Sequence, residues 1–495
     1  MSGPPPLAPI RFGTDGWRGV IAADFTFANL ERVAQAYAHF VNEHASPTTA
    51  SLGELLPAAT GEAHMRERRE GPHVVVGYDR RFLSEAFALR AAEVLSGNGI
   101  RVEMFDADVP TPLVSWAVRE RRAAGGVVIT ASHNPADFNG FKIKAPWGGS
   151  ATEQTTAGVE RLVDTSPARR AAVAADARGN LGDSVESYRR QIASRVDLER
   201  LKAARGRVVV DPMHGTGGRW VESFLTGGEV EVETIRAGRD ALFGGVAPEP
   251  IDRNLAPLKS RVREAGALVG LATDGDADRV GAVNEMGETM TMHEVVPLLL
   301  LHLARRRRLT GAVVRTFSQS VLTKRIAEAH GLRVYETPIG FKYVADLMLR
   351  EDILIGAEES GGIGVKGHLP ERDGILNSLL LLEAITAAGR PPSEMVREMH
   401  REFGEFYYGR RDLHLDVTRG LELVARLADA PPARFAGFDV TNVERLDGTK
   451  LLFADESWLL FRQSGTEPVL RIYSEATSAA KREQLLGAGV ALAHS

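Results

Sequence analysis

Three short runs of β-branched residues begin three similar blocks of the chain, at residues 74–76, 208–210 and 312–314. Continuous apolar strands of this kind suit a parallel sheet that is covered by helices on both faces. In the first and third blocks an amphipathic helix follows and ends at a glycine, Gly99 or Gly331, before another strand. This alternation predicts βαβ units with right-handed crossovers.

Each block also contains a later apolar strand whose exit loop is rich in polar and charged side chains. These strands are expected at residues 127–129, 267–271 and 353–355, and the loops that follow them cover 130–135, 274–279 and 356–362. Open α/β sheets bind their ligands where strands end. We therefore expect an α/β protein with three related α/β/α domains, each giving an equivalent loop to one central cleft.

The remainder of the chain differs from the three blocks. Alternating strands from about Phe406 indicate a smaller C-terminal α+β domain. At 495 residues the chain is long enough for several domains with separate cores. The expected domains cover 1–185, 186–304, 305–405 and 406–495. Residues 42–71 mix Ala, Ser, Thr, Pro and charged residues without periodicity, which predicts a mobile insertion in the first domain.

Composition excludes several classes of function. A net charge of −5 and a pI near 6.3 argue against nucleic-acid or anionic-membrane partners. The absence of cysteine excludes disulfides and thiol chemistry. Residues 1–10 are Pro-rich and lack the basic start and apolar core of a signal peptide, and the longest apolar stretch, at 297–301, is too short to span a bilayer. These features predict a soluble cytoplasmic protein.

Asp274, Asp276 and Asp278 stand at alternate positions directly after the apolar run 267–271. Carboxylates this close repel one another unless a divalent cation lies among them, and such hard oxygen ligands favour Mg²⁺ or Ca²⁺. Glu285 falls at position twelve of an EF-hand register, but Arg279 occupies position six, where that loop requires glycine. We therefore favour a Mg²⁺-type site over both an EF-hand and a solvated acidic turn.

Ser132 precedes His133 and the turn-forming pair Asn134-Pro135. A serine here can simply cap a strand-to-helix turn, or it can be a nucleophile that carries a phosphoryl group. No G-x-S-x-G elbow surrounds Ser132, so a hydrolase triad has little support. Lys142, downstream of this turn, adds a positive charge that suits binding of a phosphoryl group.

Three further loops have the composition of ligand sites. Residues 462–466 combine an arginine, two hydroxyls and a glycine, which is typical of anion binding. Glu358 and Ser360 alternate in a glycine-bounded loop and suit sugar hydroxyls. Residues 11–19 form a glycine-rich turn with cations, but they lack the Lys-Ser/Thr ending of a P-loop and do not indicate a nucleotide site. Each of these loops could also be an ordinary turn.

Taken in order along the chain, these motifs closely resemble the α-D-phosphohexomutase family, the phosphoglucomutases and phosphomannomutases. The resemblance spans nearly the whole sequence and rests on residues 13–16, 130–135, 274–279, 358–361 and 462–468. It implies four domains around a cleft. It also implies a resting enzyme in which Ser132 carries a phosphoryl group and, with Asp274, Asp276 and Asp278, holds Mg²⁺.

The same resemblance implies roles for the other loops. Glu358 and Ser360 resemble the residues that bind the ring hydroxyls, while Arg462, Ser464, Gly465 and Thr466 resemble the site of the non-reacting phosphate. Lys142 and Arg18 match positions linked to proton transfer or charge stabilisation, and His133 is a further candidate. Three carboxylates and one dication leave a net negative charge, which Arg279, Lys142, Lys342 and Arg18 would offset beside the transferred group.

The expected partner is a small phosphosugar that is isomerised through a hexose 1,6-bisphosphate, which also serves as activator. Glucose ranks first, because residues 337–342 and 358–360 look more like the glucose enzymes; mannose is second and glucosamine third. Gly362 stands where other branches often have a histidine, which favours Lys342 or Lys142 as acid or base. The alternatives are a phosphosugar phosphatase and a non-catalytic phosphosugar-binding protein.

Overall fold

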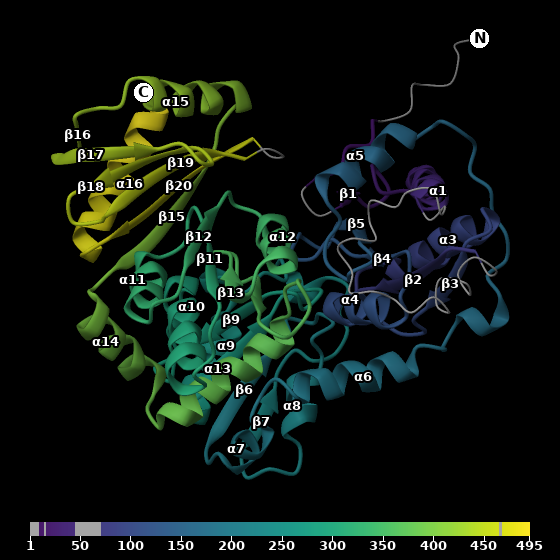
Figure 1. Ribbon diagram of the computed structural model, residues 1–495, viewed down its shortest axis with the longest axis horizontal. Helices are drawn as coiled ribbons and strands as arrows, with labels where there is room; N and C mark the ends of the chain where they lie inside the picture. The colour runs from purple at the N-terminus through teal and green to yellow at the C-terminus, as the bar shows by residue number, and fades with distance from the viewer. Residues whose placement is uncertain (1–8, 14–15, 45–70, 465–467) are drawn as a thin grey trace.

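The structure is a computed structural model that describes residues 9–13, 16–44, 71–464 and 468–495. Its strands form four sheets, one for each expected domain in chain order. Three sheets carry helices as α/β/α layers, and the last belongs to a smaller C-terminal domain, which confirms the expected fold class. In Figure 1 the first domain lies on the right and the C-terminal domain at the upper left.

Domain I contains a five-stranded mixed sheet in the order β1-β5-β4-β2-β3. Strand β2 is parallel to β3 and β4, whereas β5 is antiparallel to both β4 and β1. Its strands are β1 (Trp17–Val20), β2 (His73–Tyr78), β3 (Arg101–Met104), β4 (Gly125–Ile129) and β5 (Phe138–Lys144). Its helices are α1 (Phe27–His44), α3 (Ser84–Gly97), α4 (Thr111–Glu120) and α5 (Glu153–Leu162).

Domain II repeats this arrangement in the order β10-β9-β8-β6-β7. Its strands are β6 (Arg207–Asp211), β7 (Glu231–Thr234), β8 (Val269–Thr273), β9 (Val280–Val283) and β10 (Thr289–Met290). Helix α6 (Gly182–Ala193) leads into the domain, and α7 (Leu198–Ala203), α8 (Trp220–Leu225) and α9 (Ala256–Ala265) follow.

Domain III has a four-stranded sheet in the order β12-β11-β13-β14. Its strands are β11 (Ala312–Thr316), β12 (Val334–Thr337), β13 (Ile353–Ala357) and β14 (Ile363–Val365). The helices that pack here are α10 (Met292–Leu301), which the expected bounds placed at the end of the second domain, α11 (Val321–Ala329), α12 (Phe341–Arg350), α13 (Gly374–Ala388) and α14 (Pro392–Phe403).

The C-terminal domain IV is an antiparallel sheet with two helices. Its strand order is β15-β20-β19-β18-β17-β16. The strands are β15 (Tyr407–His414), β16 (Arg434–Phe435), β17 (Phe438–Glu444), β18 (Thr449–Phe453), β19 (Trp458–Gln463) and β20 (Val469–Ala476), and the helices are α15 (Val417–Asp429) and α16 (Ala479–His494). Strand β20 pairs with β15 and β19 over most of its length, so it forms the spine of the domain.

The β-branched runs bury alternate side chains on opposite faces of their sheets. Val75, Val208 and Val313 belong to one apolar cluster that extends through domains I, II and III, whereas Val76 and Val314 belong to clusters on the outer faces. Helix α13 is buried along most of its length and packs on β8 and β9 as well as on α10. Domains II and III therefore share part of their core.

The expected exit loops occupy equivalent positions in the three sheets. Each connects a central parallel strand to an antiparallel neighbour: β4 to β5, β8 to β9 and β13 to β14. The sheets are mixed, whereas the β-branched runs alone predicted parallel sheets. A short loop can join only antiparallel neighbours, because a parallel neighbour requires a crossover of a dozen or more residues.

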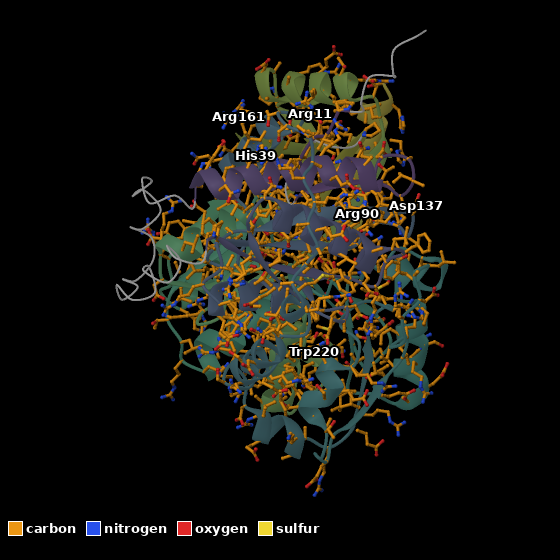
Figure 2. The ribbon with its side chains drawn as sticks, turned by 90° about the vertical axis from the view of Figure 1, so that its right-hand side faces the viewer. Arg11, His39, Arg90, Asp137, Arg161 and Trp220 are labelled. Atoms are coloured by element: carbon orange, nitrogen blue, oxygen red, sulfur yellow. The ribbon has the colours of Figure 1, made fainter. Side chains whose placement is uncertain are left out.

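Figure 2 views domain I from its outer side, where Arg11, His39 and Arg161 are labelled close to α1. Arg11 donates to Glu160 of α5 at 2.6 Å and so ties the first described residues to the domain. Most of the expected insertion at 42–71, residues 45–70, lies outside the described residues. None of the described helices has the length and apolar character needed to span a membrane.

Candidate active site

Ser132 lies in the loop between β4 and β5, with its side chain pointed at the aspartate loop of domain II. Its Oγ donates to Asp274 Oδ2 at 2.8 Å, and its amide donates to Thr130 Oγ1 at 2.8 Å. The residue is 1% exposed and has a φ of 54°, a left-handed conformation that costs energy for a residue with a side chain. The surrounding loop must therefore hold this backbone in place.

Arg81 supplies that support from the loop after β2. Its guanidinium is fully buried and donates to the carbonyl oxygens of Ser132 at 2.7 Å, Asn134 at 2.6 Å, Pro135 at 2.6 Å and Phe138 at 3.0 Å. Asp79 compensates the buried charge at 3.2 Å. Arg81 was not among the predicted site residues, although the three charged residues 79–81 directly follow a buried strand and were a visible signal.

Asp274, Asp276 and Asp278 are fully buried, and each offers an oxygen within 4.8 Å of the others. Asp276 Oδ1 and Asp278 Oδ1 are buried without a hydrogen-bond partner among the described residues. Unpaired buried carboxylate oxygens are costly, and hard oxygen donors at this spacing suit a small divalent cation. The cluster is thus chemically fit to hold a metal ion.

The three carboxylates titrate differently because their neighbours differ. Burial, followed by the charges of Asp276 and Asp278, raises the pKa of Asp274 well above its usual range. Burial is the largest influence on the pKa of Asp276 and acts to raise it, but the charge and hydrogen bond of Lys142, together with hydrogen bonds from Thr111 and Asp274, lower the pKa overall. Thr111 Oγ1, at the start of α4, adds a donor to Asp276 Oδ2 at 2.7 Å.

Two of the predicted cations lie directly at the aspartates. Lys142 Nζ on β5 donates to Asp276 Oδ2 at 2.9 Å and to Asp278 Oδ2 at 3.2 Å, and its side chain is 1% exposed. The amide of Arg279 donates to Asp274 Oδ1 at 3.1 Å, and its guanidinium lies 3.9 Å from Asp278. Strand β5 therefore inserts an ammonium from domain I into the acidic loop of domain II.

His133 is a residue of the serine loop, and Arg18 contacts that loop from strand β1. Arg18 Nη1 donates to Asn134 Oδ1, and His133 Nδ1 lies 3.5 Å from Ser132 Oγ. Burial, followed by the charges of Arg279 and Arg18, holds the pKa of His133 well below its usual value. His133 is therefore neutral at pH 7.

Glu358 and Ser360 lie in the loop between β13 and β14, which contacts the aspartate loop through its backbone. The amide of Val280 donates to the carbonyl of Gly361 at 3.1 Å. Ser360 Oγ is buried without a hydrogen-bond partner among the described residues, so it can accept or donate to a ligand. The predicted sugar loop and the predicted metal loop are thus neighbours.

Arg372 joins these two loops and is a second residue that the sequence analysis missed. Its Nη2 lies 2.9 Å from Asp278 Oδ2, and its Nη1 lies 3.7 Å from Glu358 Oε2. The preceding residue, Glu371, accepts from Lys144 Nζ of domain I at 2.8 Å, and both side chains of this pair are fully buried. The motif Glu371-Arg372-Asp373 before a helix was the only local signal.

Lys342 and Arg462 lie apart from the aspartates, and within the described residues no hydrogen bond or ion pair joins them to that cluster. Lys342 pairs with Glu153 of α5. Arg462 Nε donates to Asp447 Oδ1 at 2.9 Å, while Asp447 Oδ2 accepts from the amide of Ile339 at 2.8 Å.

The predicted phosphate loop is only partly described. The amide of Ser464 donates to the carbonyl of Val469 at 2.9 Å. Gly465 and Thr466 lie outside the described residues, as do residues 14–15 of the N-terminal motif.

Family models match the chain in four consecutive segments. They are described as phosphoglucomutase/phosphomannomutase alpha/beta/alpha domain I at residues 48–170, domain II at 186–287, domain III at 292–403, and the C-terminal domain at 416–488. The order of the four matches is the order of the four sheets.

Whole proteins are similar over almost the full length. A phosphoglucomutase/phosphomannomutase of Thermococcus kodakarensis is 33% identical over 97% of this chain and 98% of its own. A phosphoglucosamine mutase of Paracoccus denitrificans is 30% identical over 94% of both chains. A solved structure from Thermus thermophilus, provisionally assigned as a phosphomannomutase, has a TM-score of 0.83 and 37% identity, covering 99% of this chain and 100% of the other.

Proposed function

Because the chain belongs to the phosphoglucomutase/phosphomannomutase family of phosphohexomutases, we propose that it interconverts glucose 1-phosphate and glucose 6-phosphate. One observation carries this proposal. Ser132 Oγ of domain I is joined at 2.8 Å to Asp274 of a buried, metal-competent cluster in domain II. A hydroxyl held beside a divalent-cation site is suited to carry a phosphoryl group.

In the proposed reaction Ser132 is phosphorylated at rest. A hydroxyl of the bound hexose phosphate attacks the phosphorus; the new P–O bond forms to the sugar as the bond to Ser132 Oγ breaks, and the hydroxyl proton passes to a base. The resulting hexose 1,6-bisphosphate turns round, and Ser132 Oγ attacks its other phosphorus; the bond from this phosphorus to the sugar oxygen breaks, and the proton held by the base passes to that oxygen. Of the two candidate lysines, Lys142 contacts the aspartates whereas Lys342 pairs with Glu153; as an ammonium held by Asp276 and Asp278, Lys142 is the better placed to give a proton to a leaving oxygen.

Mg²⁺ fits the donor set of the cluster. Asp274, Asp276, Asp278 and an oxygen on Ser132 would hold it, and when bound it would neutralise charge on the phosphoryl oxygens. Arg18, which contacts the serine loop from β1, and Arg279 and Arg372, beside the aspartates, would stabilise the charge that develops on the transferred group, and the neutral His133 would add a hydrogen bond.

The substrate would be held by two further groups of residues. Glu358 and Ser360 would bind the ring hydroxyls, and the loop that includes Arg462, Ser464, Gly465 and Thr466 would bind the phosphate that does not react. Since the bisphosphate must bind in two orientations, one sugar loop and one phosphate loop must serve both. Ser360 Oγ, which has no hydrogen-bond partner in the described part of the chain, is consistent with a ligand at this loop.

The identity of the hexose is the most specific part of the proposal. The motif Glu358-Glu359-Ser360 supports glucose, whereas a relative at 30% identity is named a phosphoglucosamine mutase, which keeps glucosamine as an alternative beside mannose. Coupled assays with glucose, mannose and glucosamine phosphates should give the highest kcat/KM for glucose. A higher kcat/KM for glucosamine phosphate would contradict the glucose preference and leave the mutase reaction intact.

The phosphoserine is tested by intact-mass analysis and peptide mapping before and after addition of glucose 1,6-bisphosphate. The expected modification is one phosphoryl group on Ser132. Ser132→Ala should abolish turnover while phosphosugar binding, measured by calorimetry, persists. Near-native turnover by this variant would refute the mechanism, and stoichiometric release of inorganic phosphate without isomerisation would identify a phosphatase instead.

A further inference from the structure

Glu359 lies between the two proposed sugar ligands, Glu358 and Ser360, yet its carboxylate binds to domain IV. Tyr408 of β15 donates its hydroxyl to Glu359 Oε1 at 2.7 Å, and Arg410 Nη1 donates to Oε2 at 3.3 Å. The Glu359 side chain is only 17% exposed. A hydrogen bond to a largely buried carboxylate is stronger than a hydrogen bond between two neutral groups.

The opposite side of the same loop is fixed to domain II. Gly361 has a φ of +93°, and a Cβ built on it would lie 2.4 Å from the carbonyl oxygen of Val280. Only glycine permits this conformation and this close approach without strain. The sugar loop is therefore held by its backbone to the metal loop and by the side chain of Glu359 to domain IV.

The domain IV end of this link is rigid. The ring of Tyr408 stacks on His293 at 3.7 Å with an interplanar angle of 11°, and His293 Nε2 donates to the carbonyl of Ser318 at 2.8 Å. Tyr408 stands opposite Glu475 in the β15–β20 pair, and Glu475 accepts from Ser320 Oγ at 2.6 Å. Tyr408 is thus fixed both in the sheet and against domain III.

The strand that Tyr408 pairs with leads to the proposed phosphate loop. Tyr408 and Arg410 stand opposite residues 475 and 473, and β20 begins at Val469, directly after that loop. Six residues of strand span about 20 Å. A small tilt at the Glu359 contact would consequently be magnified at Arg462 and Ser464.

We propose that Glu359 is a positioning residue that keeps the sugar loop at a fixed distance from the phosphate loop of domain IV. This inference rests on the proposed function, in which one substrate contacts both loops. Since a hexose phosphate is small and rigid, the protein loops that bind its sugar and its phosphate must keep a fixed separation. A change of about 1 Å in that separation weakens productive binding. Glu359 sets that separation without touching the substrate.

The test compares Glu359→Ala, Glu359→Gln and Tyr408→Phe with the wild type. Glu359→Ala should raise the KM for hexose 1-phosphate about tenfold, the scale of one charge-assisted hydrogen bond, with a smaller change in kcat. It should also raise the concentration of added bisphosphate needed for full activity, because a loosened domain IV releases the intermediate. Glu359→Gln, which can still accept from Tyr408, should restore part of the loss.

Tyr407→Phe is the matched control, because Tyr407 is next on the same strand and donates to the exposed Glu405 at 3.0 Å. Its KM should equal that of the wild type. Combining Glu359→Ala with Tyr408→Phe should add nothing to Glu359→Ala alone, since both remove one link. A wild-type KM and bisphosphate requirement for Glu359→Ala would overturn the proposal, as would an equal rise in KM for Tyr407→Phe.

Hydrogen exchange separates this inference from the proposed function. The amides of residues 358–362 should exchange faster in Glu359→Ala and Tyr408→Phe than in the wild type, whatever the enzyme catalyses. If the wild type shows no mutase activity, the proposed function fails, and unchanged exchange in these variants then also refutes the positioning role. Faster exchange with a normal KM would refute it as well, since positioning must affect binding.

Discussion

At the scale of single residues, Asp276 Oδ1 and Asp278 Oδ1, which are buried and accept no hydrogen bond from any residue that the structure describes, indicate where a cation would bind. A ligand that binds only the folded state raises its stability by about 2.7 kcal/mol at a hundredfold excess over Kd. Mg²⁺ should therefore raise the Tm of the wild type, and EDTA should reverse the rise. Asp278→Asn should lose this Mg²⁺-dependent shift even if its own Tm is lower.

The control for this measurement is Asp252→Asn, because Asp252 is an exposed carboxylate of domain II that pairs with Lys259 at 2.6 Å. This variant should keep the full Mg²⁺ response. An equal response from Asp278→Asn would show that the cluster does not bind the ion.

Sequence alone is enough to propose the site residues whose chemistry is local. Asp274, Asp276 and Asp278 were recognisable because alternate carboxylates after a buried strand repel one another, and Ser132 because it precedes a turn at the end of a strand. Arg81 and Arg372 were not recognisable in this way. Each acts on carbonyls or carboxylates that only the folded chain gathers, and the charged residues beside each arginine in the sequence do not reveal those partners.

At the scale of elements, Arg81 is expected to hold the serine loop in its reactive shape. Arg81→Lys keeps the charge beside Asp79 but cannot donate to four carbonyls at once. Because a misplacement of about 1 Å can cost about a hundredfold in rate, kcat should fall by roughly that factor. Peptide mapping should also find less phosphate on Ser132.

Arg80→Lys is the matched control for Arg81→Lys. Arg80 is adjacent in the chain, but its guanidinium donates to Asp108 at 2.6 Å and to the carbonyl of Ala237 at 2.7 Å. This substitution should leave kcat and Ser132 phosphorylation close to wild type. Equal losses from the two substitutions would mean that the turn as a whole, and not its four carbonyl contacts, limits activity.

The helices and strands followed the sequence wherever hydrophobic periodicity was strong. The strands β2, β6 and β11 contain the three β-branched runs, and the glycines after α3 and α11 separate helix from strand as expected. Strand direction was less predictable. Strands β5, β9 and β14 are antiparallel to their neighbours because the loops before them are too short for a crossover, which apolar patterning does not reveal.

At the scale of the whole molecule, contacts between distant segments decide how the loops meet. Lys144 and Glu371 are separated by 227 residues, yet they form a fully buried ion pair between domains I and III. Such a pair is strongly destabilising to break, because the remaining charge is left unpaired. The sequence offers no signal for it, since Lys144 reads as one more charge on an amphipathic strand.

A second buried lysine lies at the junction of domains III and IV. It makes the free energy of unfolding change with pH in the alkaline range. Lys450 Nζ donates to the carbonyl of Phe317 at 2.9 Å and lies over the rings of Phe317 and Trp458. Burial, assisted by the charge of Arg315, lowers the pKa of Lys450 from 10.5 to about 8. Nearby glutamates only partly oppose this effect.

The shift in the pKa of Lys450 fixes the sign of the pH effect. Between about pH 8 and about pH 10.5 the unfolded chain keeps the Lys450 proton while the folded protein releases it, so unfolding becomes less favourable as pH rises. The free energy of unfolding rises by about 3 kcal/mol over this range, and it does not depend on Lys450 protonation below about pH 8, where both states are protonated.

Urea unfolding of the wild type and Lys450→Met should therefore diverge in favour of the wild type between about pH 8 and about pH 10. Lys481→Met, which also removes a lysine from over two aromatic rings, controls for lost packing. Parallel pH profiles of the wild type and Lys450→Met would contradict this account of the interface.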